Sequence, residues 1–299
     1  MAPIEEKSSN TKGENAAEAP EDLPVVKQLK ELDDKYLALE REYKKEVNEL
    51  TKKYTEKQRP FLEERRTILT RSEGSPSTGT PALEGFWLQA MQHHPAFEDD
   101  IMEWDEPVLK YLVDMEKTNL DDEDTDKGFR IVYKFLENPF FTNKELTKEW
   151  HTEETNPYCG EIDPTKIEAT KIDWKPGMNV TVEKVTKKVK GGGAKKAKQR
   201  KEKEEPRPSF FRSFIRKLEQ GMKLTEEMRM QAQCMQDEED EDEDDDPDEM
   251  VEALMQRDYE VGLALRENII PFAVRWYTGE ASPDDDDDDD LEDEEDEDE

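Results

Sequence analysis

Two runs of acidic residues limit how much of this chain can fold. Residues 237–249 hold twelve acids and no base, and residues 284–299 hold fifteen acids in sixteen positions. Together they supply 27 of the net −35 charges. Self-repulsion and the near absence of apolar side chains prevent such runs from forming a core. We therefore expect an acidic loop at 237–249 and a disordered acidic tail at 281–299.

The composition also excludes several classes of protein. Only 32% of the residues are hydrophobic and 41% are charged. A polyanion repels phosphate backbones, so direct high-affinity binding of nucleic acid is not expected. Two cysteines outside any C-x-x-C pair indicate neither a disulfide framework nor structural zinc, and they favour a reducing compartment. No segment approaches the roughly 18 apolar residues of a membrane helix, so we predict a soluble intracellular protein without a membrane partner.

The longest regular pattern predicts a helix over 24–71, after a disordered leader at 1–23. Apolar residues recur with a mean step of about 3.6, which keeps them on one side of a nearly straight helix. The stripe comprises Val25, Leu29, Leu32, Tyr36, Leu39, Tyr43, Val47, Leu50 and Tyr54. Pro60 either kinks this helix or starts a second one. A rod of about 70 Å with one apolar stripe needs a partner, which predicts a homodimer through Leu29 to Tyr54. The alternative is a helix lying across its own domain.

The rest of the chain predicts one α+β domain. Residues 72–85 are rich in Ser, Gly and Pro and indicate a linker. Helical spacing follows at 86–91 and 108–115, and the apolar pattern then predicts strands at 129–136, 144–150, 166–174 and 178–189. These strands form a small antiparallel sheet in a domain at 86–236, with a basic hairpin insertion at 187–203. Further helices are expected after Pro208, up to Leu218, and at 250–280, where Pro271 bends or splits the last segment.

Several strings carry a family resemblance. They are YTEKQRPFLEERRTIL, FWLQAMQHHPAFEDDIMEWDEPVLKYL, GFRIVYKFLENPFFTNKELTKEW, IDWKPGMNVTV, SFFRSF and DYEVGLALRENIIPFAVRWYTGEA. Across roughly 25–281 the chain resembles the nucleosome assembly protein family of histone chaperones. The resemblance implies a homodimer of paired long helices, an α+β domain at each end and a concave acidic underside that receives histones. It also implies that the long helix continues through Pro60. The linker after the helix is shorter than in many members, which keeps the related SET branch in view.

The acid runs have two interpretations. One is a solvated tail that only improves solubility, and the other is a surface for a polycationic ligand such as the core histones. Exposed ion pairs contribute only about 0–1 kcal/mol each, so binding would rest on many weak contacts, fast association and salt sensitivity. The candidate histone-binding residues are Asp121, Asp122, Glu123, Asp124, Asp248, Glu249, Glu252, Asp284, Asp285, Asp286, Glu292 and Glu295.

A basic run is the candidate nuclear-import signal. It comprises Lys195, Lys196, Lys198, Arg200 and Lys201, and import receptors are its expected partners. The alternative is a solvated loop that pairs with the acid tails. Leu29, Leu32, Leu37 and Leu39 have passable spacing for an export signal, but dimer packing explains them better.

No motif indicates catalysis, a cofactor or a metal. His93 and His94 are adjacent and would point in different directions, without a third ligand at zinc-like spacing. Carboxylates abound, yet no nucleophile or phosphate-binding loop accompanies them. The sequence thus predicts a non-enzymatic histone chaperone that binds core histones, prevents their aggregation with DNA, promotes nucleosome assembly and shuttles between nucleus and cytoplasm. The alternative is a SET-like acidic scaffold or regulator that recruits basic proteins, or inhibits an enzyme, without depositing histones.

Overall fold

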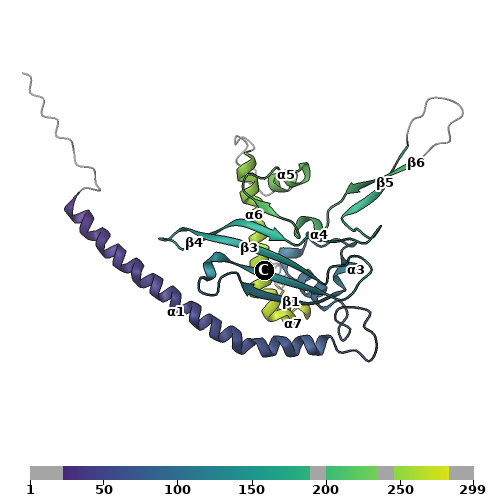
Figure 1. Ribbon diagram of the computed structural model, residues 1–299, viewed down its shortest axis with the longest axis horizontal. Coiled ribbons are helices and arrows are strands. Elements are labelled where there is room, and N and C mark those ends of the chain that lie inside the picture. Colours follow the sequence, from purple (N-terminus) through teal and green to yellow (C-terminus); the bar gives the residue numbers. More distant parts are fainter. Residues whose placement is uncertain (1–22, 189–199, 235–245, 283–299) are drawn as a thin grey trace, which may run out of the picture. The chain divides into compact units, whose positions relative to one another are not determined.

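The computed structural model describes residues 23–188, 200–234 and 246–282 (Figure 1). The chain forms two compact units that divide after Leu50, within the first helix. That helix, α1, is continuous from Pro24 to Leu69 and contains Pro60 in its interior. The helix therefore continues through the proline, as the family resemblance implied.

The unit from residue 51 onward contains a five-stranded antiparallel sheet. Its strands are β1 (Leu112–Asn119), β2 (Gly128–Phe135), β3 (Glu145–Asn156), β4 (Glu161–Ala169) and β7 (Leu218–Glu219), in the order β1-β2-β3-β4-β7. A separate hairpin pairs β5 (Val182–Lys188) with β6 (Arg200–Pro206). The predicted α+β fold class, with a long N-terminal helix and a small antiparallel sheet, is confirmed.

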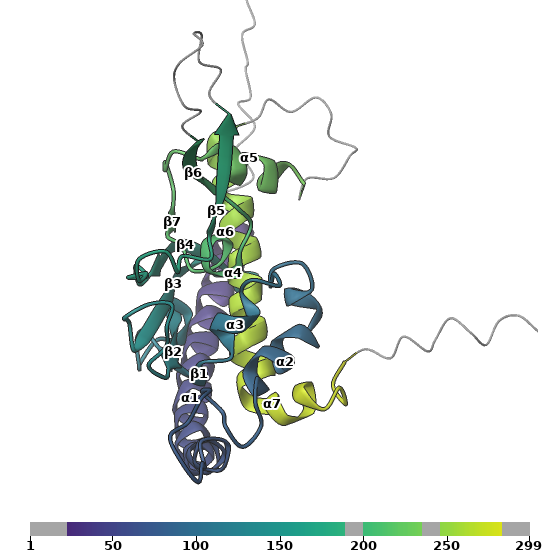
Figure 2. The same cartoon turned by 90° about the vertical axis from the view of Figure 1, so that its right-hand side faces the viewer.

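Helices cover one face of this sheet. Figure 2 shows α2, α6 and α7 to one side of strands β1 to β4. The helical elements of this unit are α2 (Phe86–Gln92), η2 (Pro95–Phe97), α3 (Glu106–Leu109), η3 (Thr125–Lys127), α4 (Phe210–Ser213), α5 (Glu226–Gln233), α6 (Pro247–Leu263), the π-helical segment η4 (Ala264–Ile269) and α7 (Ile270–Tyr277). Phe272 in α7 departs from helical geometry, with φ −115° and ψ 27°. The predicted disturbance at Pro271 is thereby confirmed.

The core forms between the inner face of the sheet and α6. Alternate residues of β2 and β3 are buried, as the period-2 pattern predicted for Phe129, Ile131, Tyr133 and Phe135. Gly262 permits the close approach of α6, because a Cβ atom there would lie 2.6 Å from the ring of Trp150. The Trp150 indole also donates a 2.9 Å hydrogen bond to Oδ1 of Asp258 on α6.

The helix predicted over 108–115 is wrong. Helix α3 ends at Leu109, and Leu112 and Met115 lie in strand β1, where both are buried. The register of β1 against β2 shifts between Leu112 and Asp114. Because of this bulge, Leu112 and Met115, which are three positions apart, both face the core. A spacing of three is typical of a helix, which explains the wrong prediction.

Other predicted bounds also shift. The strand expected at 166–174 is β4, which ends at Ala169, and Trp174 instead bridges to Phe141. The strand expected at 178–189 begins only at Val182. The helix expected up to Leu218 is the single turn α4, and Leu218 belongs to β7. Short apolar clusters such as these do not distinguish a helix turn from a buried strand end.

The segment predicted as a linker packs on the domain in its second half. Thr78 and Thr80 are buried, and the Gly79 amide donates a 2.9 Å hydrogen bond to the Lys110 carbonyl. A Cβ atom on Gly79 would lie 2.2 Å from the Leu112 carbonyl oxygen. Glycine at this position therefore allows the connecting segment to lie against the start of β1.

Candidate functional site

The apolar stripe of α1 is exposed along its whole length. Every side chain of the predicted dimerisation set is between 38% and 65% exposed: Leu29, Leu32, Tyr36, Leu39, Tyr43, Val47, Leu50 and Tyr54. Soluble proteins rarely leave a continuous row of large apolar side chains in water. The stripe therefore has the character of a surface that another helix covers.

The acidic loop after β1 is partly occupied with its own folding. Asp121 accepts hydrogen bonds from the amides of Glu123 and Asp124 at 2.8 and 3.2 Å, and it pairs with Lys127 at 2.8 Å. Lys127 lowers the pKa of Asp121 below its ordinary value. Asp122 and Glu123 are exposed. Of the four predicted ligands in this loop, these two are the most available to a partner.

The start of α6 carries three more of the predicted ligands. Asp246 caps the helix, because its side chain accepts a 3.0 Å hydrogen bond from the amide of Asp248. Asp248 and Glu249 lie in the first turn, where carboxylates interact favourably with the helix dipole. Glu252 follows on the next turn, and all three are exposed. A helix terminus thus presents a group of fixed carboxylates.

A hollow of about 440 Å³ lies beside Glu252, between α6, the strands β3 and β4, and the segment after β7. Asp163 of β4 and Glu252 of α6 line it, together with Thr155, Gln220, Met255 and other neighbours. Thr155 donates to Asp163 at 2.7 Å, and Gln220 donates to Glu252 at 3.3 Å. In the described part of the chain, neither carboxylate forms an ion pair. The hollow therefore combines two uncompensated negative charges with an apolar floor at the buried Met255.

Further acids converge on the same side of α6, around Tyr259. Burial raises the pKa of Tyr259, Arg266 opposes that shift, and Asp126, Asp163 and Glu267 add to it. The three carboxylates come from η3, β4 and η4, which are distant in the sequence. We call Asp126, Asp163, Glu252, Glu260 and Glu267 the α6 acidic face.

Sequence reasoning missed most of the α6 acidic face. Of its five members only Glu252 was predicted. Positions 252, 256, 260 and 263 share one side of a helix, so the helical repeat of α6 could have indicated Glu260. Asp163 lies close to Glu252 only because strand β4 lies beside α6. The spacing of residues along the sequence does not predict that contact.

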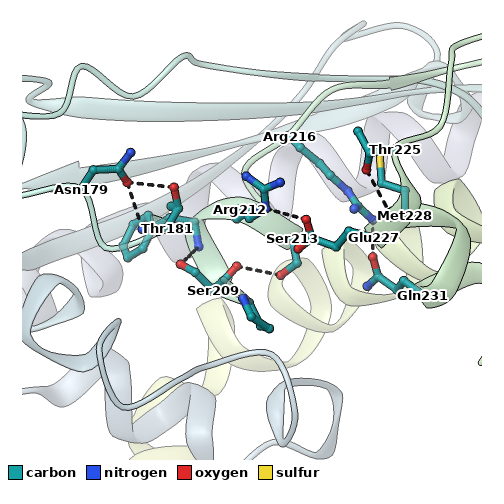
Figure 3. A network of polar contacts seen from close by, with 12 residues as sticks. Asn179, Thr181, Ser209, Arg212, Ser213, Arg216, Thr225, Glu227, Met228 and Gln231 are labelled. Atoms are coloured by element: carbon teal, nitrogen blue, oxygen red, sulfur yellow. Dashed lines mark hydrogen bonds and ion pairs between the residues drawn. The ribbon is translucent and has the colours of Figure 1, made fainter. Parts of the chain in front are cut away.

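Helix α5 anchors one end of the first acid run. Arg212 pairs with Glu227 at 2.7 Å and Arg216 donates to Gln231 at 2.9 Å. Figure 3 shows these contacts. Thr225 caps the helix by accepting a 3.3 Å hydrogen bond from the amide of Met228. α5 ends at Gln233 and α6 begins at Pro247, so both flanks of the run are held by the folded domain. Residues 235–245 themselves lie outside the described residues.

The remaining predicted site residues are also outside the described part. Asp284, Asp285, Asp286, Glu292 and Glu295 of the terminal acid run lie outside the described residues. The same holds for Lys195, Lys196 and Lys198 of the basic run. The backbone of Arg200 and Lys201 pairs in β6, while their side chains lie outside the described set.

The two adjacent histidines have separate partners. Nδ1 of His93 lies 2.7 Å from the Trp276 carbonyl oxygen, and Nδ1 of His94 accepts from the Ala96 amide at 3.1 Å. The His94 ring packs on Trp276 with 4.4 Å between centroids. These contacts indicate that both histidines have a structural role in packing. Among the described helices, none has the length and apolar character needed to cross a membrane.

Comparison with known proteins assigns the family. A sequence model of the family described as Nucleosome assembly protein (NAP) matches residues 24–280. The chain belongs to the NAP family. It is 33% identical to nucleosome assembly protein 1;4 of Nicotiana tabacum over 273 residues, which cover 86% of this chain and 69% of that protein. It is 34% identical to nucleosome assembly protein 1;2 of the same plant, covering 87% of this chain and 66% of that one. The chain thus spans about two thirds of the length of these NAP relatives.

Solved NAP structures share the fold. Nucleosome assembly protein 1 from Plasmodium knowlesi is 27% identical, with a TM-score of 0.60, and the match covers 85% of this chain and 95% of that one. A nucleosome assembly protein from Plasmodium falciparum is 27% identical with a TM-score of 0.55, covering 85% and 96%. The order of long helix, antiparallel sheet and covering helices is therefore the NAP arrangement.

Proposed function

We propose that this NAP-family chain is a histone chaperone that binds core histones, prevents their non-specific aggregation with DNA and promotes nucleosome assembly. The observation that carries the proposal is the α6 acidic face, where Asp163 and Glu252 line a hollow without an ion-pair partner in the described structure. Histones are rich in Lys and Arg, which supply the charge that this face lacks.

The proposed mechanism is a distributed electrostatic one. A Lys or Arg side chain fits the hollow, with its cation between Asp163 and Glu252 and its aliphatic stem toward Met255. The exposed Asp122, Glu123, Asp248 and Glu249, and the acid runs, add further contacts. Each exposed pair contributes only about 0–1 kcal/mol, so the complex forms fast and stays labile. DNA then displaces the chaperone, because its phosphates form a denser line of charge and release condensed counterions.

The proposed active species is a homodimer. Leu29 to Tyr54 on α1 form an exposed stripe that a second copy of α1 would cover. When two copies pair through the same stripe, the twofold axis relates them and the assembly stops at a dimer. Each stripe is then covered by the other, so no apolar surface of α1 is left unpaired. The dimer would present two acidic domains to one histone cargo.

We further propose that the chain shuttles between nucleus and cytoplasm. The basic run Lys195, Lys196, Lys198, Arg200 and Lys201 follows a glycine triplet in the sequence and extends into β6, and clustered Lys and Arg residues are the feature that import receptors recognise. Histones made in the cytoplasm would then travel with their chaperone.

A plasmid supercoiling assay tests the proposed function. Relaxed plasmid, core histones, topoisomerase and the full chain at physiological salt are expected to give supercoils, with histone binding that saturates at a fixed stoichiometry. Histone binding without supercoiling would instead assign the chain to acidic scaffolds or regulators of the SET type.

Neutralising the hollow should weaken histone binding. The double variant Asp163→Asn and Glu252→Gln removes two negative charges, and we expect the dissociation constant for histones to rise about five- to tenfold near 0.15 M salt. Fluorescence titration over a salt series measures the change. The matched control, Glu73→Gln with Glu84→Gln, removes the same charge from exposed positions outside the hollow. If the control variant loses the same amount of histone affinity, the effect comes from net charge and the hollow has no specific role.

A further inference from the structure

The outer face of the sheet carries a second polar cluster, remote in sequence from the acid runs. Glu149 and His151 are two residues apart on β3, so their side chains share one face. Glu168 of β4 pairs directly with Glu149 across the two strands. Two carboxylates directly opposite each other repel, and in this register Arg130 and Lys166 each pair with one of them.

The three side chains converge on a common point. Nε2 of His151 lies 3.5 Å from Oε2 of Glu149 and 3.9 Å from Oε2 of Glu168. One ligand atom from each residue can be chosen so that all three lie within 4.8 Å of one another. Tetrahedral ligands on bonds of about 2.1 Å are separated by about 3.4 Å. Small rotations of the two carboxylates would therefore complete a coordination triangle.

The surrounding cations orient the carboxylates and leave one oxygen of each toward the histidine. Nε and Nη2 of Arg130 each contact Oε1 of Glu149 at 2.8 Å. Nζ of Lys166 contacts Oε1 of Glu168 at 2.6 Å. The Oε2 atoms, which approach His151, are the ones that these cations do not hold. Metal-binding carboxylates are commonly fixed by such outer hydrogen bonds.

One ring nitrogen of His151, Nε2, has no hydrogen-bond partner among the described residues. This atom is also shielded from solvent. Protonation of Nε2 would pair the ring with the two carboxylate oxygens at 3.5 and 3.9 Å. A metal cation that takes all three atoms as ligands would satisfy the nitrogen and both carboxylates at once.

We propose that Glu149, His151 and Glu168 bind one divalent ion of the zinc class. Imidazole with two carboxylates suits Zn²⁺ and its chemical relatives, whereas Mg²⁺ and Ca²⁺ prefer all-oxygen sites. The His151 and Glu168 side chains are 38% and 36% exposed, which leaves water as the fourth ligand. The ion links the neighbouring strands β3 and β4. This site is independent of histone binding and of the proposed chaperone function.

Cobalt binding to the full, tag-free chain tests the proposal. Co²⁺ is titrated in excess Mg²⁺, which occupies the hard oxygen sites of the acid runs. A rise in the intensity of the visible Co²⁺ absorption reports four-coordinate binding, which the proposed site predicts. We expect one saturable site per chain that Zn²⁺ displaces. His151→Ala and Glu168→Gln should each weaken Co²⁺ binding at least tenfold, while His93→Ala should leave it unchanged.

Thermal unfolding supplies a second readout. Zn²⁺ should raise the Tm of the parent chain and of His93→Ala, but not that of His151→Ala or Glu168→Gln, because only an ion bound to the native site stabilises it. Circular dichroism of each variant without metal should match the parent chain. A parent chain without a saturable cobalt band, or a His151→Ala variant with parental stoichiometry and affinity, would overturn the metal site.

Discussion

Replacing Leu39 and Tyr43 by glutamate should convert a dimer into a monomer. Both side chains are 62% exposed near the middle of the α1 stripe. Burying a large apolar side chain stabilises an interface by about 2 kcal/mol, and a twofold dimer contains each of these positions twice. Introduced carboxylates would also face one another in the interface. We expect the dissociation constant to rise by at least a factor of about 1000.

Sedimentation velocity measures this change directly. The control variant, Ala38→Glu with Lys45→Gln, makes the same change in charge on the opposite side of α1. It should remain dimeric. The thermal unfolding of the domain after residue 51 should be preserved in both variants, whereas helical circular dichroism should fall only in the monomer, because an isolated helix is marginal in water. A parent chain that sediments as one copy, or a stripe variant that sediments as two, would contradict the dimer.

Removing the buried carboxylate of Asp258 should strongly destabilise the domain. Lys148 is fully buried, its Nζ lies 2.6 Å from Oδ2 of Asp258, and it also contacts the Phe214 carbonyl. Burial lowers the pKa of Lys148 to about 8, and the ion pair with Asp258 opposes that shift. Asp258→Ala leaves a buried ammonium without its counter-ion, and the Trp150 indole keeps only its 3.2 Å hydrogen bond to the main-chain carbonyl of residue 258. The free energy of unfolding should therefore fall by about 3–5 kcal/mol.

Urea denaturation of two variants separates the pair from its burial. The double variant Lys148→Met with Asp258→Asn removes both charges and keeps an acceptor for Trp150. Replacing a buried ion pair by uncharged side chains of similar size often changes the free energy of unfolding very little. We therefore expect the double variant to lose less than half as much unfolding free energy as Asp258→Ala. Equal losses in the two variants would show that the shape of the site, and not the uncompensated charge, sets the cost.

Periodicity made the long elements predictable. The stripe from Leu29 to Tyr54 indicated α1, and alternation from Phe129 to Phe135 indicated β2, because each pattern repeats often enough to fix its period. Leu112 and Met115 were misassigned because a bulge changes the facing of residues within one strand. A single irregularity outweighs the pattern in so short a segment.

Cross-strand neighbourhoods made the polar clusters hard to predict. The predictions found acids that are adjacent in sequence, such as Asp121 to Asp124, yet Lys127 and backbone amides already engage part of that loop. Asp163 beside Glu252, and Glu168 beside Glu149, depend on strand register and on the path of α6. The Glu-Trp-His spacing at 149–151 was a visible signal on a strand, but its third member lies in another strand.

The outer border of β4 has a consequence for how this protein behaves when crowded. Only Lys166 and Ile167 pair with β7, which leaves the remainder of β4 as an open strand margin. Pro164 lacks an amide there, and β4 pairs irregularly with β3 near His151 and Asn156. These irregularities interrupt the regular row of amide and carbonyl groups to which a strand from another molecule would hydrogen-bond. This margin of the sheet is thus protected from strand-to-strand polymerisation at high protein concentration.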